Sequence, residues 1–180
     1  GGGWGWGGYQ HFQRYLTVFD SVRVVCRVFP VTAEQKAFVR CDGPGVSFAG
    51  APLFSGLWQY AWNRVHLTSQ LRALYDPHSA YLLRVPSQMS FDFARVLRER
   101  KHSFGLIVVA DPRGEFSSGA TRSVLRPYLR YRFSSTLQRL CQEADVVAYV
   151  TRHALQQAYP CPHGKRVDGA SDAFLGPAWF

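Results

Sequence analysis

Several features that define large classes of proteins are missing from this sequence. No run approaches the roughly 18 to 20 apolar residues that a membrane span needs, so any membrane contact would be peripheral. The four cysteines form no CxxC pair and no charged-then-apolar secretory leader precedes them, which favours a reduced, cytoplasmic setting with free thiols. The sequence also has no acidic, Ser-rich or Gln-rich tract, no internal repeat and no coiled-coil heptad. We therefore expect neither disorder nor a fibrous architecture.

What is present fits one globular domain. With 180 residues, of which 47% are hydrophobic and 15% aromatic, the chain is long enough for one core and too short for two ordinary domains. We therefore predict a single domain over 1–180, with its core in 8–160 and an irregular tail in 161–180 that leads toward a further domain absent from this sequence.

The net charge of +9 is compatible with several classes of partner and does not distinguish between them. Most of the basic residues are arginines, which suit phosphate-bearing ligands, nucleic acid and anionic membranes, but a solvated arginine-rich surface explains the charge equally well. Because the arginines are spread over several predicted helices and no nucleic-acid motif is present, we expect no nucleic-acid partner. Cys161 and His163 lack a second pair at zinc spacing, so we expect a surface loop there and no metal.

Helical patterns and apolar strands alternate along the chain. The expected strands are 21–29, 46–50, 80–85, 104–112 and 145–150, and the expected helices are 9–19, 53–75, 89–102, 122–144 and 152–160. Irregular chain is expected over 30–45 and a Gly/Ser loop over 112–121, and the tryptophans of 53–75 are expected in the core. The strands are apolar runs, which is typical of parallel strands covered on both faces. The pattern predicts an α/β fold: a Rossmann-like, doubly wound, mostly parallel sheet with helices on both faces.

The opening GGGWGWGGYQ could be a phosphate-cradling loop, a flexible linker or the turn left by a strand that has been cut away. Gly3, Gly5 and Gly8 satisfy G-x-G-x-x-G, but no strand comes before them and no acid ends the next expected strand, as a dinucleotide site requires. We favour a strand-to-helix loop whose strand, the first of the fold, is absent from the sequence. Glycines there let backbone N–H groups approach an anionic or hydroxyl-rich ligand.

The order of the later motifs resembles a known family. YLLRVPS, then LIVVADPRGEFS, then EADVVAYVTRHALQQAYP, after a glycine-bearing loop, resemble the N-terminal half of GT-B glycosyltransferases of family 4, over most of residues 7–160. The resemblance implies two Rossmann-like domains, with the acceptor bound by the N-terminal half and the nucleotide-sugar gripped mainly by a C-terminal half that this sequence lacks.

What the resemblance implies for function is an acceptor-binding half of a glycosyltransferase. It would act on a saccharide or lipid-linked acceptor, with a nucleotide-sugar as donor substrate, no cofactor, and the missing domain supplied in cis or in trans. On its own such a chain would be inactive. The alternative is a non-catalytic sugar- or nucleotide-binding module of the same fold.

Ligands of open α/β sheets bind beyond the carboxyl ends of the strands. That rule selects these candidate site residues: Gly7, Gly8, Arg84, Ser87, Asp111, Arg113 and Thr151. Asp111 is the candidate catalytic residue, as a base or as a carboxylate that orients the acceptor hydroxyl, and the others are candidate acceptor contacts. Ordinary structural roles compete: Asp111 as a turn former, Arg84 as its ion-pair partner, and Ser87 and Thr151 as helix caps.

The segment SVLRPYLRYRF interleaves arginines with aromatic residues. Such a helix would suit an anionic bilayer that holds a lipid-linked sugar, and its apolar stripe is also what a helix needs to cover a sheet. We favour the sheet-covering role, with peripheral membrane contact as a secondary hypothesis.

Overall fold

The computed structural model describes residues 3–5, 8–28, 38–51, 56–115 and 125–170, although not the side chains of 56–58 and 61. These residues fall into two units, one within Gly1–Gln70 and one within Leu71–Asp172, and each is described by itself. The single domain predicted over 1–180 stays a prediction.

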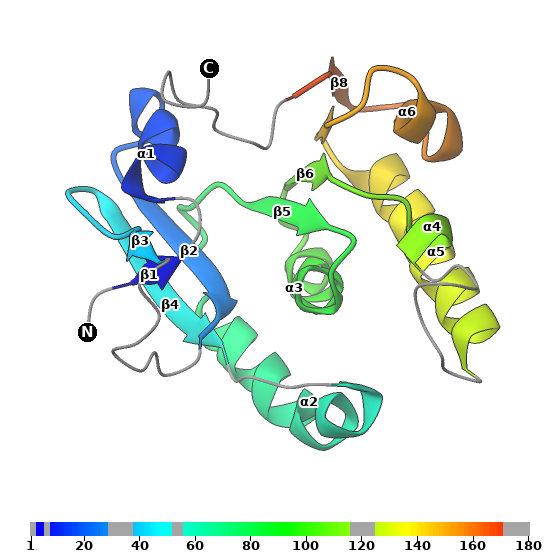
Figure 1. Ribbon diagram of the computed structural model, residues 1–180, viewed down its shortest axis with the longest axis horizontal. Helices are drawn as coiled ribbons and strands as arrows, with labels where there is room; N and C mark the ends of the chain where they lie inside the picture. Colours follow the sequence, from blue (N-terminus) through cyan, green and yellow to red (C-terminus); the bar gives the residue numbers. More distant parts are fainter. Residues whose placement is uncertain (1–2, 6–7, 29–37, 52–55, 116–124, 171–180) are drawn as a thin grey trace. The chain divides into compact units, whose positions relative to one another are not determined.

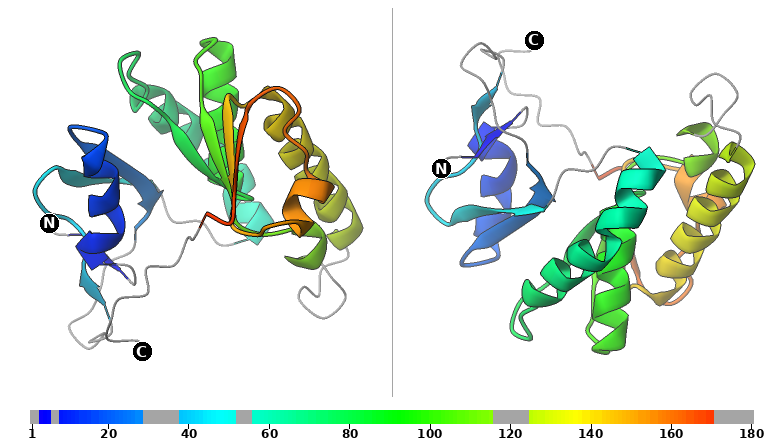
Figure 2. Two further views of the ribbon diagram at one scale, coloured as in Figure 1. Left: turned by 90° about the horizontal axis from the view of Figure 1, so that it is seen from above. Right: turned by 90° about the horizontal axis from the view of Figure 1, so that it is seen from below.

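The first unit is built around a pair of parallel strands. In chain order its elements are β1 (Trp4–Gly5), α1 (Gly8–Gln13), a 3-10 turn (Arg14–Thr17), β2 (Val22–Arg27), β3 (Val39–Arg40), β4 (Val46–Ala51) and α2 (Gly56–Ala73), whose last turn already belongs to the second unit. β2 and β4 pair in parallel over their whole length, and α1 lies beside them (Figure 1 and Figure 2). The ring of Phe12 on α1 meets that of Phe48 on β4 edge-on, with centroids 5.3 Å apart. The strands expected over 21–29 and 46–50 are therefore present, and they pair in parallel.

The glycine-rich start differs from the loop that we expected. Trp4–Gly5 pairs antiparallel with Val39–Arg40, and the Gly3 N–H donates to Asp42 Oδ1 at 3.0 Å. Val39–Arg40 forms a strand within the segment that we expected to be irregular. The sequence does not predict this short strand because its hydrogen-bond partner, Trp4–Gly5, is distant along the chain. Residues 3–5 are thus tied to residues 39–42.

One tryptophan of α2 is not in the core. Trp62 is 86% exposed, as is its neighbour one turn away, Val65, at 82%, so the prediction of a core position for Trp62 is wrong. The side chain of Trp58 lies outside the described residues. On a helix whose apolar residues are spread around its axis, the sequence does not indicate which side is covered.

The second unit carries a four-stranded parallel sheet. Its elements in chain order are β5 (Leu82–Val85), α3 (Gln88–Glu99), β6 (Gly105–Val108), α4 (Pro112–Glu115), α5 (Arg126–Glu143), β7 (Val146–Tyr149), α6 (Ala154–Ala158) and β8 (Lys165–Asp168). The strands lie in the order β5-β6-β7-β8, each parallel to the next (Figure 2). The predicted α/β class with parallel strands is confirmed, whereas the doubly wound arrangement stays a prediction.

The two faces of this sheet differ in burial. Residues paired across neighbouring strands point to the same face. One face is buried at 5% exposure or less through Leu83, Val85, Leu106, Val108, Val147 and Tyr149. On the opposite face Leu82 is 47% and Val167 is 48% exposed, while Ile107 and Ala148 are half-buried. Within the described unit the core therefore lies on one side of the sheet.

α3 and α5 pack side by side against the buried face. Consecutive right-handed crossovers in one direction bring both helices to the same side of a parallel sheet. The rings of Phe91 and Phe133 lie 5.2 Å apart, and Arg98 Nε lies 2.9 Å from Glu143 Oε2. Pro127 occupies the first turn of α5, where its missing N–H costs little.

Aromatic side chains and a histidine fill the amino-terminal edge of the sheet. His102 Nε2 lies 3.0 Å from the Ser79 carbonyl oxygen, so this nitrogen carries the proton, and Nδ1 lies 3.2 Å from the Tyr75 hydroxyl. The Tyr75 and Tyr81 rings stack with centroids 6.1 Å apart. His78 is exposed in the preceding turn. These contacts are all internal, so the amino edge serves the fold.

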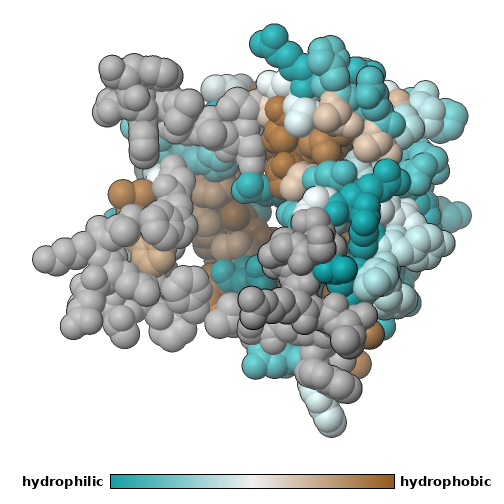
Figure 3. All heavy atoms as spheres, turned by 45° about the vertical axis from the view of Figure 1, so that its right-hand side comes forward, coloured by the Kyte–Doolittle hydropathy of each residue, from teal (hydrophilic) through white to brown (hydrophobic). Residues whose placement is uncertain are grey.

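The surface carries apolar patches among hydrophilic side chains (Figure 3). The exposed apolar residues of α5 and its N-cap are Leu125 at 48%, Tyr128 at 58% and Tyr131 at 74%. In the part of the chain that the structure describes, none of the helices has the length and apolar character needed to cross a membrane.

Candidate functional site

The carboxyl ends of β5 to β8 meet at one edge because all four strands run in the same direction. Backbone hydrogen bonds continue the edge beyond the strands: Val109 N donates to Val85 O at 2.8 Å and Val150 N donates to Val108 O at 3.2 Å. Open α/β sheets bind ligands beyond this edge. We call the residues gathered there the carboxyl-edge site: Asp111, Arg113, Glu115, Thr151 and Tyr159.

Asp111 follows β6 and begins α4. Its Oδ1 accepts the Arg113 N–H at 2.8 Å, and its carbonyl oxygen accepts the N–H groups of Gly114 at 3.0 Å and Glu115 at 3.2 Å. A carboxylate before Pro112 can cap a helix in this way because proline at the first helical position has no N–H to satisfy. α4 therefore stands where the sequence predicted the start of a loop. Asp111 has the structural role that we considered, and its catalytic role stays a prediction.

Tyr159 holds the same carboxylate oxygen from the other side. Its ring is 1% exposed, and its hydroxyl donates to Asp111 Oδ1 at 2.5 Å and lies 3.4 Å from Ser134 Oγ. Burial and the hydrogen bond to Asp111 raise the pKa of Tyr159 to about 12, so the hydroxyl stays protonated at neutral pH. Oδ1 thus has two donors, whereas Asp111 Oδ2 accepts no hydrogen bond from the residues that the structure describes.

A second carboxyl group lies beside Asp111. Partial burial and the nearby charge of Asp111 raise the pKa of Glu115. Acid–base chemistry commonly uses a pair of neighbouring carboxyl groups that lie in different environments. The side chain of Arg113, between the two acids in the sequence, is exposed and adds positive charge near this pair.

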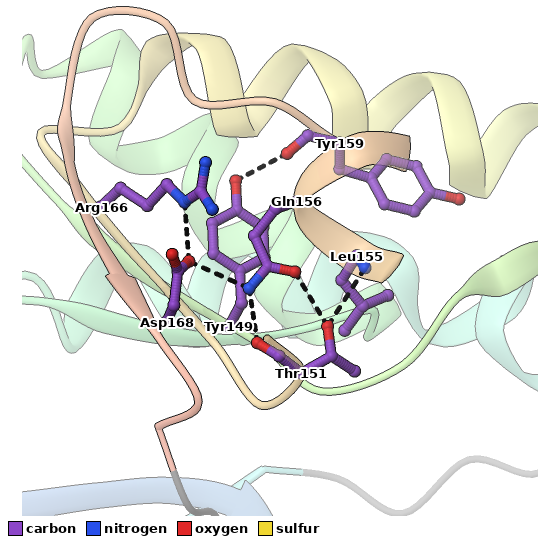
Figure 4. Close-up of polar contacts among 7 residues, drawn as sticks. All are labelled: Tyr149, Thr151, Leu155, Gln156, Tyr159, Arg166 and Asp168. Carbon is purple, nitrogen blue, oxygen red and sulfur yellow. Dashed lines mark hydrogen bonds and ion pairs between the residues drawn. The ribbon is translucent and has the colours of Figure 1, made fainter. Parts of the chain in front are cut away.

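Thr151 belongs to a hydrogen-bond network at the ends of β7 and β8 (Figure 4). Its hydroxyl donates to Gln156 Oε1 at 3.0 Å and accepts the Leu155 N–H at 3.1 Å, and its carbonyl oxygen accepts Gln156 Nε2 at 2.5 Å. The predicted capping role of Thr151 toward α6 is confirmed. A ligand contact would compete with these bonds and stays a prediction.

Gln156 connects that network to β8. The side chain is 5% exposed, and its Nε2 also donates to Asp168 Oδ1 at 2.9 Å, which Arg166 Nε approaches to 2.7 Å (Figure 4). The hydrogen bonds from Arg166 and Gln156 lower the pKa of Asp168. A buried amide with both ends satisfied fixes α6 against β8.

The remaining candidates are Arg84, Ser87, Gly7 and Gly8. Arg84 is exposed on the partly exposed face of the sheet, and its carbonyl oxygen accepts the Ser90 hydroxyl at 2.6 Å. Ser87 is the N-cap residue of α3, although its hydroxyl makes no capping hydrogen bond. Gly8 begins α1 with φ of +65°, a conformation that favours glycine, and is described with the first unit alone; Gly7 lies outside the described residues.

No cluster in the described ranges offers the three or more His, Cys, Asp or Glu side chains that would hold a metal ion. Cys161 is half-buried and His163 is exposed. The expected absence of a metal or cofactor stays a prediction.

Two residues of the carboxyl-edge site, Glu115 and Tyr159, were not predicted as site residues, and neither was Gln156, which hydrogen-bonds to Thr151. Gln156 and Tyr159 lie within the expected helix 152–160, and both side chains are buried. A buried polar side chain needs a hydrogen-bond partner, and this requirement could have pointed to both residues. Glu115 lay in a segment predicted to be a loop, which gave no indication of where its carboxyl group points.

No protein-family model, curated protein or solved structure matches this chain.

Proposed function

We propose that this chain is the acceptor-binding half of a glycosyltransferase with the GT-B fold, which transfers a sugar from a nucleotide-sugar to a saccharide or lipid-linked acceptor. The proposal includes a doubly wound Rossmann-like domain and a second domain, in cis or in trans, that binds the nucleotide-sugar. It also includes a cytoplasmic location, peripheral to the inner face of the membrane when the acceptor is lipid-linked.

The Asp111 carboxylate carries the proposal. It lies at the carboxyl edge, with Oδ1 held by Arg113 N–H and Tyr159 O–H and with Oδ2 receiving no hydrogen bond from the described residues. A carboxylate fixed by one oxygen can use the other to orient an acceptor hydroxyl and take its proton. This geometry supports an acceptor subsite.

Glu115 and Arg113 complete the chemistry on α4. A carboxyl group with a raised pKa, such as Glu115, can hold or release a proton near Asp111. The Arg113 guanidinium is exposed and can pair with an anionic part of the acceptor or of the leaving diphosphate.

Binding of an alkyl glycoside to the whole chain tests the acceptor subsite. Saturation-transfer NMR with octyl glucoside, below its micelle concentration, should show contact with the wild-type chain. Asp111→Asn should weaken that binding roughly 10-fold or more, because a charged hydrogen-bond acceptor is lost. Asp145→Asn makes the same chemical change at the exposed, amino-terminal end of β7 and should bind as the wild type does.

Two results would contradict the proposal: no saturation transfer to the wild-type chain, or equal binding by wild type and Asp111→Asn. If nucleotide-sugar is added together with a separately supplied nucleotide-sugar-binding domain and no transfer occurs although the glycoside binds, the non-catalytic sugar-binding module is the better description.

Membrane contact through α5 is the second part of the proposal. Leu125, Tyr128 and Tyr131 are exposed at three-residue spacing, Arg130 is exposed between the tyrosines, and the first turn holds no acidic residue. Amphipathic aromatic rings and arginines together favour the headgroup region of an anionic bilayer.

Vesicle co-sedimentation checks this contact. We expect binding to phosphatidylglycerol vesicles, little binding to phosphatidylcholine vesicles, and a several-fold loss in a Tyr128→Ser, Tyr131→Ser double variant. Val65→Ser, which removes an exposed apolar side chain from α2, is the matched control and should leave binding unchanged. Binding that does not depend on anionic lipid would remove this part of the proposal.

A further inference from the structure

The Tyr159 hydroxyl lies between two elements of the second unit. It reaches Asp111 Oδ1, after β6, at 2.5 Å and Ser134 Oγ, on α5, at 3.4 Å. Both Tyr159 and Ser134 are buried, at 1% and 9% exposure, so water does not compete freely for these groups. A hydroxyl has a single proton, and the shorter contact to a charged acceptor takes it.

The direction of these bonds follows from that proton. Tyr159 donates to Asp111, so its oxygen is left to accept from the Ser134 hydroxyl. The pKa of Tyr159, raised to about 12, keeps the donated proton on the tyrosine throughout the neutral range. A chain from Ser134 through Tyr159 to Asp111 is therefore oriented toward the carboxylate, and each bond strengthens the next.

The backbone of Tyr159 is itself fixed. Its carbonyl oxygen accepts the hydroxyl of Tyr149 at 2.6 Å, and its N–H donates to Leu155 O at 2.8 Å (Figure 4). Tyr149 lies on β7 with 0% exposure. The position of the Tyr159 ring is thus set by the strand next to β6, which makes it a rigid support for a side chain at the carboxyl edge.

We propose that Tyr159 is a positioning residue for Asp111: it holds Oδ1 so that Oδ2 faces the acceptor hydroxyl. This inference rests on the proposed function, because it assumes that Asp111 contacts the acceptor. Arg113 N–H fixes Oδ1 from α4, and Tyr159, the C-cap residue of α6, fixes it as well, so two donors restrain the rotation of the carboxylate.

Tyr159→Phe tests this role because it keeps the ring and removes only the hydroxyl. In the full chain we expect a 5- to 10-fold weaker binding of octyl glucoside, a loss within the usual net value of one hydrogen bond. The unfolding midpoint and near-ultraviolet circular dichroism should stay close to those of the wild type. The carboxyl 13C resonance of Asp111, identified by its absence in Asp111→Asn, should shift.

Ser134→Ala is the graded second variant, since it leaves the Tyr159–Asp111 bond in place. We expect a smaller loss, about 2-fold, with a smaller shift of the Asp111 resonance. Wild-type binding by Tyr159→Phe, while Asp111→Asn has lost binding, would overturn the positioning role and leave the proposed function intact. Absence of glycoside binding by the wild-type chain, or wild-type binding by Asp111→Asn, would overturn both.

Discussion

Buried side chains with a titratable proton determine the pH behaviour that we expect from this chain. Burial is the main cause that raises the pKa of Cys141 and of Tyr159, each to about 12, and it also raises the pKa of Tyr149. Their ordinary values are 9.0 for cysteine and 10.0 for tyrosine. Each group therefore holds its proton more tightly in the folded chain than in the unfolded one.

The sign of the pH effect follows from that difference. Below pH 9 both states are protonated and the full contribution to stability is present; above it the unfolded chain loses protons first, and stability falls until pH 12 is passed. We expect the urea midpoint of unfolding to decrease steadily from pH 9 to pH 11. Cys141→Ala should show a shallower decrease, and a wild-type midpoint that is constant over this range would contradict the assignment.

At the residue scale the sequence predicts where a group lies along the chain better than what it contacts. Asp111 could be predicted because an apolar strand followed by Asp-Pro is a local pattern. The contact between Tyr159 and Asp111 joins residues 48 positions apart, and its geometry depends on how α6 packs against the sheet. Thr151 was predictable as a cap because its partner, Leu155, is one turn away.

Single glycines set how closely the elements of the second unit approach. A Cβ at Gly164 would overlap the carbonyl oxygens of Ala144 and Asp145, whereas a Cβ at Gly114 would meet nothing within 4 Å. The Gly164 backbone leads directly into β8, whose Lys165 N–H donates to Asp145 O at 2.8 Å. Since carbonyl oxygens of a strand entry cannot move aside as a flexible side chain would, Gly164→Ala must displace the start of β8.

We therefore expect Gly164→Ala to lower the free energy of unfolding by about 1–3 kcal/mol. Gly114→Ala, the matched control on α4, should leave it within about 1 kcal/mol of the wild type. Urea denaturation of the two variants checks both values. Equal stability of Gly164→Ala and the wild type would show that β8 is not held as closely as described.

The predicted elements agree with the structure where a periodic pattern is long. The helices over 89–102 and 122–144 correspond to α3 and α5, because apolar residues recur along one side of each. The two-residue strands β1 and β3 were missed, since such short pairs carry no periodic signal and depend on a partner elsewhere in the chain.

At the scale of the molecule, the second unit has its own core. The side chains of Val85, Leu106, Val108 and Val147 are 0% exposed on one face of a sheet that belongs entirely to this unit. A fragment of residues 71–172 should therefore fold by itself and unfold in a single urea transition. Leu106→Asp in the fragment should abolish the transition, because it places a charge in that core. A fragment without a cooperative transition would show that its core needs the rest of the chain.

The apolar strand runs predicted parallel pairing correctly, but not how the strands divide between units. Runs such as 21–29 and 104–112 are alike in composition, and composition does not state which strand pairs with which. Among the described residues, β2 pairs with β4 alone, and β5 to β8 form a separate sheet. This division is seen in the three-dimensional structure and could not be predicted from the composition of the strands.

The strand order β5-β6-β7-β8 also bears on how the sheet forms. Each strand pairs with the next one in the chain, so every pairing closes one crossover connection between consecutive strands. Chains emerge from the ribosome with their N-terminal parts first. The sheet can therefore grow one strand at a time during synthesis, and its central pair, β6 with β7, can assemble before β8 has been made.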